Sequence, residues 1–202
     1  MTGLFIAFEG GDGAGKSTQV KLLAAALQEL GHEVVVTREP GGSDVAEHIR
    51  EVLLNPNHRI DGISEALLFA AARADHVNKV IRPALQRNNV VISDRFVDSS
   101  IAYQGVAREL GIEKVRELNL WATDNLVPDL TIVLDVTTNA GLARAQEPNR
   151  MENEGADFHE VVKDAFLTLA KQNPERYLVL SAHQSRETIA QEILQQVQNR
   201  LK

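Results

Sequence analysis

Apolar runs alternate with helical patterns along the whole chain. Short runs rich in Val, Ile and Leu predict strands at residues 4–8, 33–37, 90–93, 130–136 and 177–180. Between them, apolar residues at helical spacing predict helices at residues 16–30, 43–54, 64–87, 98–104, 112–125, 138–145, 157–172 and 186–201. Continuous apolar runs are typical of strands that are buried on both faces. The pattern predicts an α/β fold: a doubly wound, five-stranded parallel sheet flanked by helices.

Glycine and proline mark the limits of the predicted helices. Gly31 ends the first helix, and Asp61-Gly62 forms a turn before the third. Pro83 falls inside the third helix, where a proline has no N–H to donate and its ring clashes with the preceding turn. We therefore expect a kink or an early end near Arg82.

Composition fits one globular domain. Of the 202 residues, 44% are hydrophobic and 24% are charged, which are ordinary values for such a domain. No linker or repeat divides the chain, so we expect residues 1–202 to form a single domain. Residues 146–155 are polar and aperiodic, which is typical of a mobile surface loop and favours a lid.

Charge and cysteine content narrow the functional classes. A net charge of −7 argues against a general nucleic-acid binder, whose affinity depends on basic patches. The chain has no cysteine, which excludes disulfides and thiolate metal sites. No apolar run reaches membrane-span length and the N-terminus lacks the basic stretch of a signal peptide, so we expect a cytoplasmic protein with no membrane partner.

Residues 10–18 match the phosphate-loop pattern G-x-x-x-x-G-K-[ST], between a predicted strand and a predicted helix. In this context, backbone N–H groups and the helix N-terminus bind the phosphates of ATP. Lys16 would reach the β- and γ-phosphates as a catalytic cation, and the Ser17 hydroxyl would bind Mg²⁺. The alternative is a glycine-rich turn that matches by chance. The candidate ATP-binding residues are Gly10, Gly11, Asp12, Gly13, Ala14, Gly15, Lys16, Ser17 and Thr18.

Asp94 and Arg95 follow the third predicted strand. An acidic residue at the carboxyl end of a parallel strand, near a phosphate loop, is placed to direct Mg²⁺, so Asp94 is a candidate metal and catalytic residue. The alternative is that Asp94 caps the next helix. Arg95 favours the first interpretation, because a cation here suits a second, phosphorylated substrate.

Two further segments carry candidate substrate contacts. Arg38 opens a stiff Pro-Gly-Gly turn and is able to bind a phosphate with both guanidinium nitrogens, although it is also consistent with a solvated loop arginine. Phe69 and Arg73 lie four residues apart on one helical face, where they are able to stack on a base and bind its edge. The alternative for this pair is a core phenylalanine and a surface arginine.

The segment after Arg95 offers hydroxyl and amide groups. Ser100, Tyr103 and Gln104 share a predicted helical face and are suited to reading a sugar or a base. Arg144 and Arg150 flank or occupy the polar loop, where a closing lid would bring cations onto phosphates. A capped helix start and ordinary surface arginines are the alternatives.

Taken together, these segments resemble the bacterial-type thymidylate kinases, within the P-loop nucleoside monophosphate kinases. The resemblance rests on residues 8–18, 38–42, 69, 73, 94–96 and 99–105, which run in family order and cover about half of the chain directly. It implies an ATP-dependent kinase that converts dTMP to dTDP by direct in-line transfer, in dTTP synthesis. It further implies Mg²⁺ as the cofactor and a homodimer as the assembly.

The resemblance also implies roles for the acceptor-binding residues. Phe69 would stack on thymine and Arg73 would meet its O4, while Ser100 and Gln104 would read the rest of the pyrimidine edge. Tyr103 would crowd the 2′ position of the sugar and favour deoxyribose.

For the phosphates, the resemblance implies that Arg38 and Arg95 hold the acceptor phosphate, with Asp12 near that phosphate and its sugar. Arg144 would lie over adenine. The phosphate loop carries no arginine, so the catalytic arginine is expected from the lid, with Arg150 as the candidate.

Other functions remain open at this point. Another nucleoside monophosphate kinase of the same fold is the nearest alternative. A GTPase would need an Asn-Lys-x-Asp motif, whereas Asn78-Lys79 lacks the aspartate. An ATPase acting on nucleic acid conflicts with the acidic charge, and a non-catalytic nucleotide sensor would bind ATP without turnover.

Overall fold

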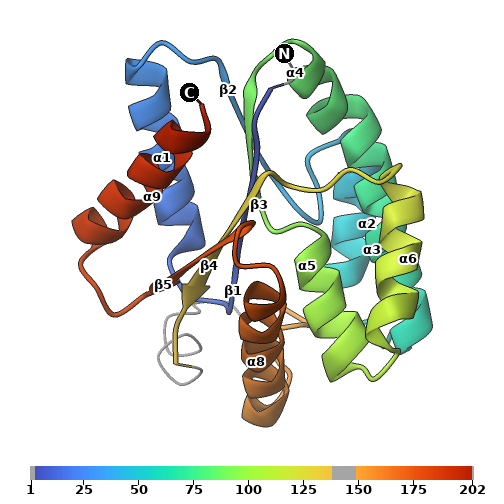
Figure 1. The fold of residues 1–202 in the computed structure, drawn as a ribbon. Helices are drawn as coiled ribbons and strands as arrows, with labels where there is room; N and C mark the ends of the chain where they lie inside the picture. Colours follow the sequence, from blue (N-terminus) through green and yellow to red (C-terminus); the bar gives the residue numbers. More distant parts are fainter. Residues whose placement is uncertain (1–2, 138–148, 202) are drawn as a thin grey trace.

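One all-parallel sheet organises the computed structural model, which describes residues 3–137 and 149–201 (Figure 1). Its strands are β1 (Phe5–Gly10), β2 (Val34–Arg38), β3 (Val90–Asp94), β4 (Leu130–Asp135) and β5 (Tyr177–Ser181). Their order across the sheet is β2-β3-β1-β4-β5, with β1 in the middle and every residue of β1 buried. The predicted five-stranded α/β fold is confirmed, and each strand begins and ends within two residues of its prediction.

Helices cover both faces of this sheet (Figure 1). The described helices are α1 (Lys16–Glu29), α2 (Asp44–Leu54), α3 (Gly62–His76), α4 (Arg82–Gln86), α5 (Val97–Ser100), α6 (Ile112–Ala122), α8 (Ala156–Gln172) and α9 (Arg186–Arg200), with π-helical turns η1 (Val77–Ile81) and η2 (Ile101–Ala107). On one face, α1 and α9 pack against the sheet around Phe8, Leu27 and Ile193. On the other, the core includes Ile81 and Phe166. This is the doubly wound arrangement that buries a parallel sheet from water.

The strand register aligns the carboxyl ends of the three neighbouring strands β2, β3 and β1. Arg38 of β2 and Phe8 of β1 are both register partners of Asp94, the last residue of β3. Because the strands are parallel, the segments that follow them emerge at the same edge of the sheet. The phosphate loop, the Arg38 turn and Arg95 are thereby brought together from three distant parts of the sequence.

The long helix predicted at residues 64–87 is present, but it begins earlier and contains a π-helical turn. It begins at Gly62, because the Asp61 carboxylate accepts hydrogen bonds from the N–H groups of Ile63 and Ser64, at 3.0 and 3.1 Å. The π-helical turn η1 ends just before Arg82-Pro83. A π-helical turn changes the hydrogen-bond spacing, so the chain continues as helix past the proline.

Two other helices differ from their predicted limits. The helix predicted at 98–104 runs from Val97 to Ala107, because η2 extends α5 with π-helical spacing. The helix predicted at 112–125 ends at Ala122. Asp124 and Asn125 have φ angles of 49° and 58° there, and the Asn125 N–H closes the end by donating to the Leu120 carbonyl at 2.8 Å.

The helix predicted at 138–145 lies outside the described residues. Of the predicted lid, residues 149–155 are described and form a turn that leads into α8. Within residues 3–137 and 149–201, no helix has both the length and the apolar character needed to cross a membrane.

Candidate active site at the carboxyl edge of the sheet

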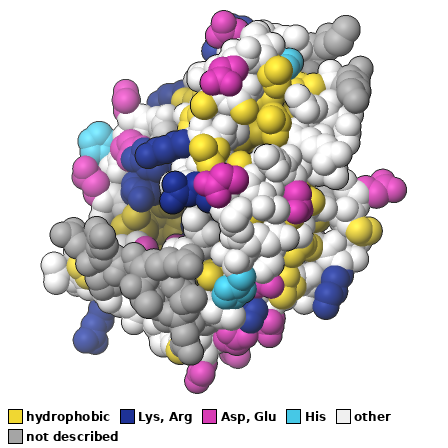
Figure 2. All heavy atoms as spheres, turned by 90° about the vertical axis from the view of Figure 1, so that its left-hand side faces the viewer, with side chains coloured by type: hydrophobic (Ala, Val, Ile, Leu, Met, Phe, Trp, Pro, Cys, Tyr) yellow, Lys and Arg dark blue, Asp and Glu magenta, His cyan; other side chains and the backbone are white. Residues whose placement is uncertain are grey.

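A cavity of about 480 Å³ lies at the carboxyl edge of the sheet. Figure 2 shows a hollow with Lys and Arg side chains gathered at its border. The cavity brings together most of the predicted site residues: Asp12, Gly13, Gly15, Lys16, Ser17, Thr18, Arg38, Phe69, Arg73, Asp94, Arg95, Ser100, Tyr103 and Gln104. Gly10, Gly11 and Ala14 belong to the same phosphate loop but do not line this cavity.

The phosphate loop turns sharply between β1 and α1. Gly10 has a φ of 129°, and a Cβ there would lie 2.5 Å from the Leu134 carbonyl oxygen, so only glycine fits against β4. The Lys16 ammonium folds back into the loop and donates to the carbonyls of Gly10 and Gly11, at 3.1 and 2.8 Å. Burial and the neighbouring Arg95 lower the pKa of Lys16, so an anion bound in the loop would stabilise its charge.

Ser17 and Asp94 meet across the end of the sheet. The Ser17 hydroxyl donates to the Asp94 carboxylate at 2.9 Å. Hydroxyl and carboxylate oxygens are hard ligands of the kind that Mg²⁺ takes, usually together with water and substrate phosphates rather than in an all-protein cage. This donor pair, beside the phosphate loop, fits the Mg²⁺ ion expected from the sequence.

Arg95 links the phosphate loop to the helix after β3. Its φ of 73° is unusual for a residue with a side chain, and the backbone is held by hydrogen bonds from Arg95 N–H to the Phe8 carbonyl and from the Ser93 hydroxyl to the Arg95 carbonyl. The guanidinium donates to Asp12 at 2.6 Å and to the Ser99 hydroxyl at 3.1 Å.

Mutual charge stabilises this pair. Burial raises the pKa of Asp12, but the charges of Arg95 and Lys16 outweigh that effect and the net shift is downward. Burial acts to lower the pKa of Arg95. The nearby Tyr103 and Asp12 act in the opposite direction, and the net shift of the Arg95 pKa is upward. A permanently charged guanidinium is therefore fixed between the phosphate loop and the rest of the cavity.

Behind Arg95, Glu9 is completely buried at the end of β1. Its carboxylate accepts from the Ser99 hydroxyl at 2.6 Å and from the N–H groups of Phe96 and Ser99 at 2.8 and 3.2 Å. Burial, reinforced by the nearby charge of Asp98, raises the pKa of Glu9 to about 7. Glu9 thus fixes the position of the Ser99 hydroxyl, and that hydroxyl accepts a hydrogen bond from the Arg95 guanidinium.

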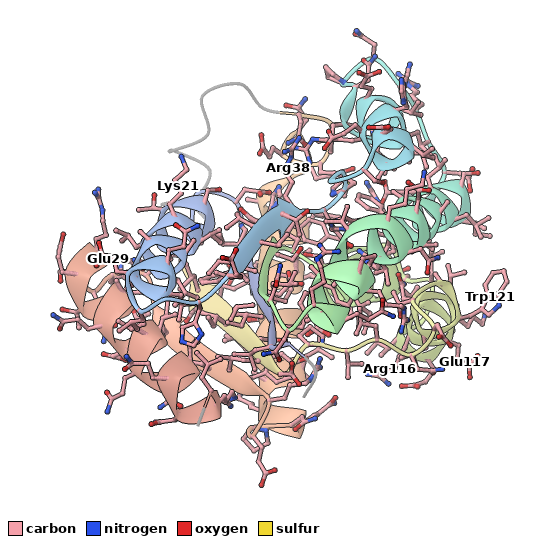
Figure 3. All side chains as sticks on the ribbon, turned by 90° about the horizontal axis from the view of Figure 1, so that it is seen from above. Lys21, Glu29, Arg38, Arg116, Glu117 and Trp121 are labelled. Carbon is pink, nitrogen blue, oxygen red and sulfur yellow. The ribbon has the colours of Figure 1, made fainter. Side chains whose placement is uncertain are left out.

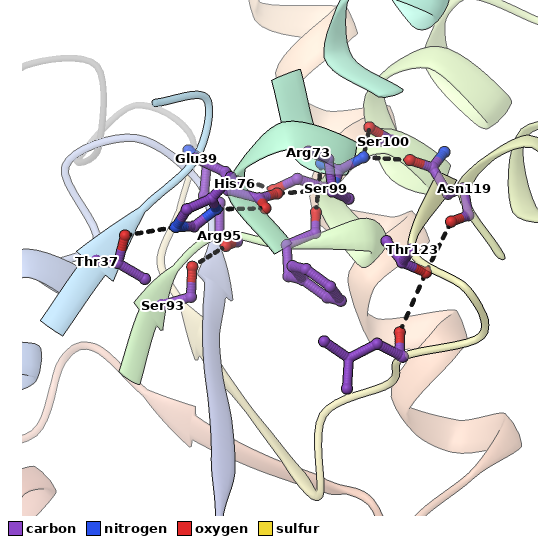
Figure 4. Close-up of polar contacts among 12 residues, drawn as sticks. Thr37, Glu39, Arg73, His76, Ser93, Arg95, Ser99, Ser100, Asn119 and Thr123 are labelled. Atoms are coloured by element: carbon purple, nitrogen blue, oxygen red, sulfur yellow. Dashed lines mark hydrogen bonds and ion pairs between the residues drawn. The ribbon is translucent and has the colours of Figure 1, made fainter. Parts of the chain in front are cut away.

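Arg73 lies in a fully formed polar network, shown in Figure 4. Its Nε donates to Glu39 at 2.6 Å, its Nη1 donates to the Ser100 hydroxyl at 3.0 Å and to the Asn119 side-chain oxygen, and its Nη2 donates to the Phe96 carbonyl. The second Glu39 oxygen pairs with the His76 ring. The surface-arginine alternative for Arg73 is therefore wrong, since only 3% of the residue is exposed.

Gln104, Phe69 and Tyr103 also line the cavity. The Gln104 side-chain N–H donates to the buried carboxylate of Glu65 at 2.8 Å. The Tyr103 hydroxyl lies 3.5 Å from the Asp12 carboxylate, and the Arg95 guanidinium lies over the Tyr103 ring. The shared helical face expected for Ser100, Tyr103 and Gln104 is confirmed, since all three line one cavity.

Arg38 lines the cavity from the end of β2. Its guanidinium donates to both oxygens of Glu47, at 3.0 and 2.9 Å, and the same carboxylate accepts from the Gly42 N–H at 2.8 Å. Arg38 is half exposed, so solvent screens this pair and an incoming phosphate is able to compete for the guanidinium.

Arg50 also lines the cavity and was missed by the sequence analysis. Its Nη1 donates to the Pro40 carbonyl at 2.6 Å, and burial together with the charge of Arg38 lowers its pKa. A signal was present: Arg50 lies four residues after Ala46 and three before Leu53, on the buried face of α2. A charged residue at a buried helical position indicates a partner inside the fold.

Arg150, the candidate lid arginine, does not line the cavity. Its guanidinium donates instead to the Leu53 carbonyl at 2.7 Å and to Glu65 at 2.7 Å. A buried carboxylate is a stronger partner for a guanidinium than open solvent, and Glu65 is completely buried. Asn149, Met151 and Glu152, its neighbours, line the cavity instead. Arg144 lies outside the described residues.

Comparisons with known proteins show which family the chain resembles. The model of a family described as thymidylate kinase matches residues 8–193. A thymidylate kinase of Clavibacter sepedonicus is 54% identical over 197 residues, covering 96% of this chain and 93% of that protein. One of Lactobacillus acidophilus is 47% identical over 209 residues, covering 100% of this chain and 96% of that protein. A crystal structure of thymidylate kinase from Ehrlichia chaffeensis has a TM-score of 0.81 and 36% identity, covering 98% of this chain and 100% of that one.

Replacing Glu9 by Gln is expected to change how stability depends on pH. The Glu9 carboxyl has an ordinary pKa of 4.5 when exposed to water and a pKa of about 7 when folded, so the folded state binds its proton more tightly. Between these values the free energy of unfolding falls as pH rises, by at most about 1.4 kcal/mol per pH unit. Urea denaturation at pH 4.5 to 7.5 should show this fall weakened in Glu9→Gln. The exposed control Glu29→Gln should keep it, and parallel curves for wild type and Glu9→Gln would contradict the assignment.

Proposed function

The chain belongs to the thymidylate kinase family and phosphorylates dTMP, and we propose that its cavity binds this acceptor at one end and the phosphates of ATP at the other. One observation carries the proposal. A single cavity is lined by the phosphate loop and by the polar edge of Arg73, Ser100 and Gln104, with Arg95 between them. Two nucleotides bound in this way would meet at Arg95 through their phosphates.

The acceptor end has the chemistry of a pyrimidine site. We assign Phe69 to stacking on the base, and Arg73, Ser100 and Gln104 to the hydrogen bonds along its edge. Tyr103 packs against the ring of Phe158 and is nearly fully buried, so it presents a fixed wall to the sugar. A wall at the 2′ position favours deoxyribose.

At the phosphate end, repulsion between the two substrates is the main obstacle. The acceptor phosphate is mostly a dianion at pH 7, because its second pKa is about 6. Two like unit charges about 4 Å apart repel by about 4 kcal/mol at an effective dielectric constant near 20. We assign Lys16, Arg38, Arg95 and Arg50 to offsetting this repulsion, since all four line the cavity.

Transfer then needs positioning rather than a general base. An oxygen of the acceptor phosphate forms a bond to the γ-phosphorus of ATP while the bond from that phosphorus to the bridging oxygen breaks, which yields dTDP and ADP. The acceptor oxygen already carries negative charge, so no proton has to be removed. Asp12 acts by fixing Arg95 at 2.6 Å.

Ser17 and Asp94 would hold Mg²⁺ beside the phosphate loop. When bound, the ion supplies positive charge to the β- and γ-phosphate oxygens. The product dTDP leads to dTTP, and we propose a cytoplasmic location for this step. The lid, about residues 146–155 of a single domain, is proposed to cover the phosphates during transfer.

A panel of acceptors tests the function. Purified protein with ATP and Mg²⁺ should release ADP fastest with dTMP and more slowly with dUMP, dCMP, dGMP and dAMP, and EDTA should abolish the release until excess Mg²⁺ is restored. Rapid turnover of another monophosphate, with dTMP left unconverted, would replace this proposal by a different kinase of the same fold.

Replacing Arg95 by Ala is expected to separate transfer from ATP binding. The variant should lose at least about 100-fold in kcat/KM for dTMP, because the cation between the two substrates is removed. Binding of a non-hydrolysable ATP analogue, measured by calorimetry, should change less than about threefold, since Lys16 and the loop remain. The control Arg87→Ala, at an exposed arginine that does not line the cavity, should behave as wild type. Equal losses in binding and transfer would contradict the role.

We also propose a homodimer through the neighbouring helices α2, α3 and α6. These helices expose apolar side chains: Val45, Val52, Ile63, Leu67 and Trp121. Trp121 is 82% exposed and points outward from α6 in Figure 3. A second copy of the same face would remove this surface from water, and C2 dimers are the commonest soluble oligomers.

Trp121→Glu should weaken the dimer. A charge placed in a dimer interface costs desolvation energy, so sedimentation velocity should show the dimer Kd rising at least about tenfold. Leu30→Glu, at an exposed apolar position just after α1, is the matched control and should leave the Kd unchanged. A monomeric wild-type protein, or a Trp121→Glu dimer of unchanged Kd, would refute this interface.

A further inference from the structure

We infer that Glu65 is a positioning residue that fixes the orientation of the Gln104 side-chain amide, and thereby which pyrimidine edge the cavity accepts. The inference rests on the proposed function, since it concerns the base end of the same cavity. Gln104 would touch the substrate, whereas Glu65 would act only through Gln104.

Glu65 leaves Gln104 one orientation. Glu65 has no exposed surface, and its Oε1 accepts a hydrogen bond from the Gln104 Nε2 at 2.8 Å. An ionised carboxylate only accepts hydrogen bonds, so the amide must turn its NH₂ group toward Glu65 and its carbonyl oxygen away. With the opposite orientation, two oxygens would face each other inside the protein, which is strongly unfavourable because neither would have a donor.

The carbonyl oxygen of Gln104 faces the cavity. Gln104 lines the cavity, and among the described residues none donates a hydrogen bond to its Oε1. This oxygen is also absent from the fully buried, unpartnered side-chain atoms of the described chain, as expected for an oxygen that the cavity reaches. It offers a bound base a fixed acceptor.

Donors line the same cavity as this acceptor. The Ser100 hydroxyl oxygen accepts from Arg73, which leaves the Ser100 hydrogen free to be donated into the cavity. An acceptor beside donors complements an imide edge, where an N–H lies between two carbonyl oxygens. Thymine and uracil have this edge. A pyrimidine with an unprotonated N3 would place a lone pair against the Gln104 oxygen.

Two arginines also donate hydrogen bonds to Glu65. Arg150 donates to Oε2 at 2.7 Å, and Arg108 donates to Oε1 and Oε2, each at 3.3 Å. In Glu65→Gln, both arginines would compete for the one remaining oxygen, because guanidinium groups are donors only. The new NH₂ group would then face Gln104 and turn its amide over, presenting a donor to the base.

The experiment compares two acceptors that differ only at this edge. One is dTMP; the other is the 5′-monophosphate of 5-methyl-2-oxopyrimidine deoxyriboside, which has an unprotonated N3 and no 4-substituent. For Glu65→Gln, the ratio of kcat/KM for dTMP to that for the analogue should fall at least about tenfold, a change of about 1.4 kcal/mol. An unchanged ratio would overturn the inference.

A double-mutant cycle separates positioning from general damage to the fold. In a Gln104→Ala background, Glu65→Gln should leave the ratio unchanged, because the amide through which it acts is gone. An equal fall of the ratio in both backgrounds would show that Glu65 acts by another route and would overturn the inference. Glu154→Gln, which removes the negative charge of another partner of Arg108, is the matched control and should keep the wild-type ratio.

A second variant and a wild-type measurement complete the experiment. If Glu65→Gln does not fold, Glu65→Asp withdraws the carboxylate from Gln104 and should lower the ratio partway; an unchanged ratio in this variant would overturn the inference. Wild-type activity on dTMP is measured alongside, so that failure of the proposed function appears as loss of turnover in the wild type, whereas failure of the inference appears only in the ratios.

Discussion

Buried carboxylates determine the arrangement of this site. Glu9, Glu39 and Glu65 are each at least 95% buried, and a buried carboxylate is tolerated only where hydrogen bonds or opposite charges surround it. Each one meets this requirement with a group that lines the cavity or supports it: Glu9 with Ser99, Glu39 with Arg73, and Glu65 with Gln104. Buried carboxylates therefore fix, through hydrogen bonds and ion pairs, the side chains that line the cavity.

This support matters because the reaction requires fixed cations. Reorganising charged side chains during transfer would cost free energy, whereas a guanidinium already fixed near the phosphates stabilises charge at no such cost. Arg95 has this property, with Asp12 and Ser99 on its guanidinium and two hydrogen bonds on its left-handed backbone. Arg73, which is assigned to the base edge, is also fixed in advance, with four partners for its guanidinium.

Local patterns predicted much of the fold and the phosphate site. The phosphate loop is one continuous segment, and its function depends only on a strand before it and a helix after it, both of which are visible in the sequence. Asp94 and Arg95 were identified in the same way, from the end of an apolar run. Parallel strands then bring these segments to one edge, as the alternation of strands and helices implies.

The sequence by itself determined the sheet, the loop and the order of the charged residues along the chain; only the tertiary structure decided which charges pair. Arg150 and Glu65 are 85 residues apart, and Gln104 and Glu65 are 39 apart, so no spacing rule connects them. Arg50 shows the same limit, since its position on the buried face of α2 indicated a partner without saying which. The physical reason is that backbone hydrogen bonds are local or follow strand pairing, whereas a buried charge takes whichever partner the packing of distant helices brings within about 3 Å.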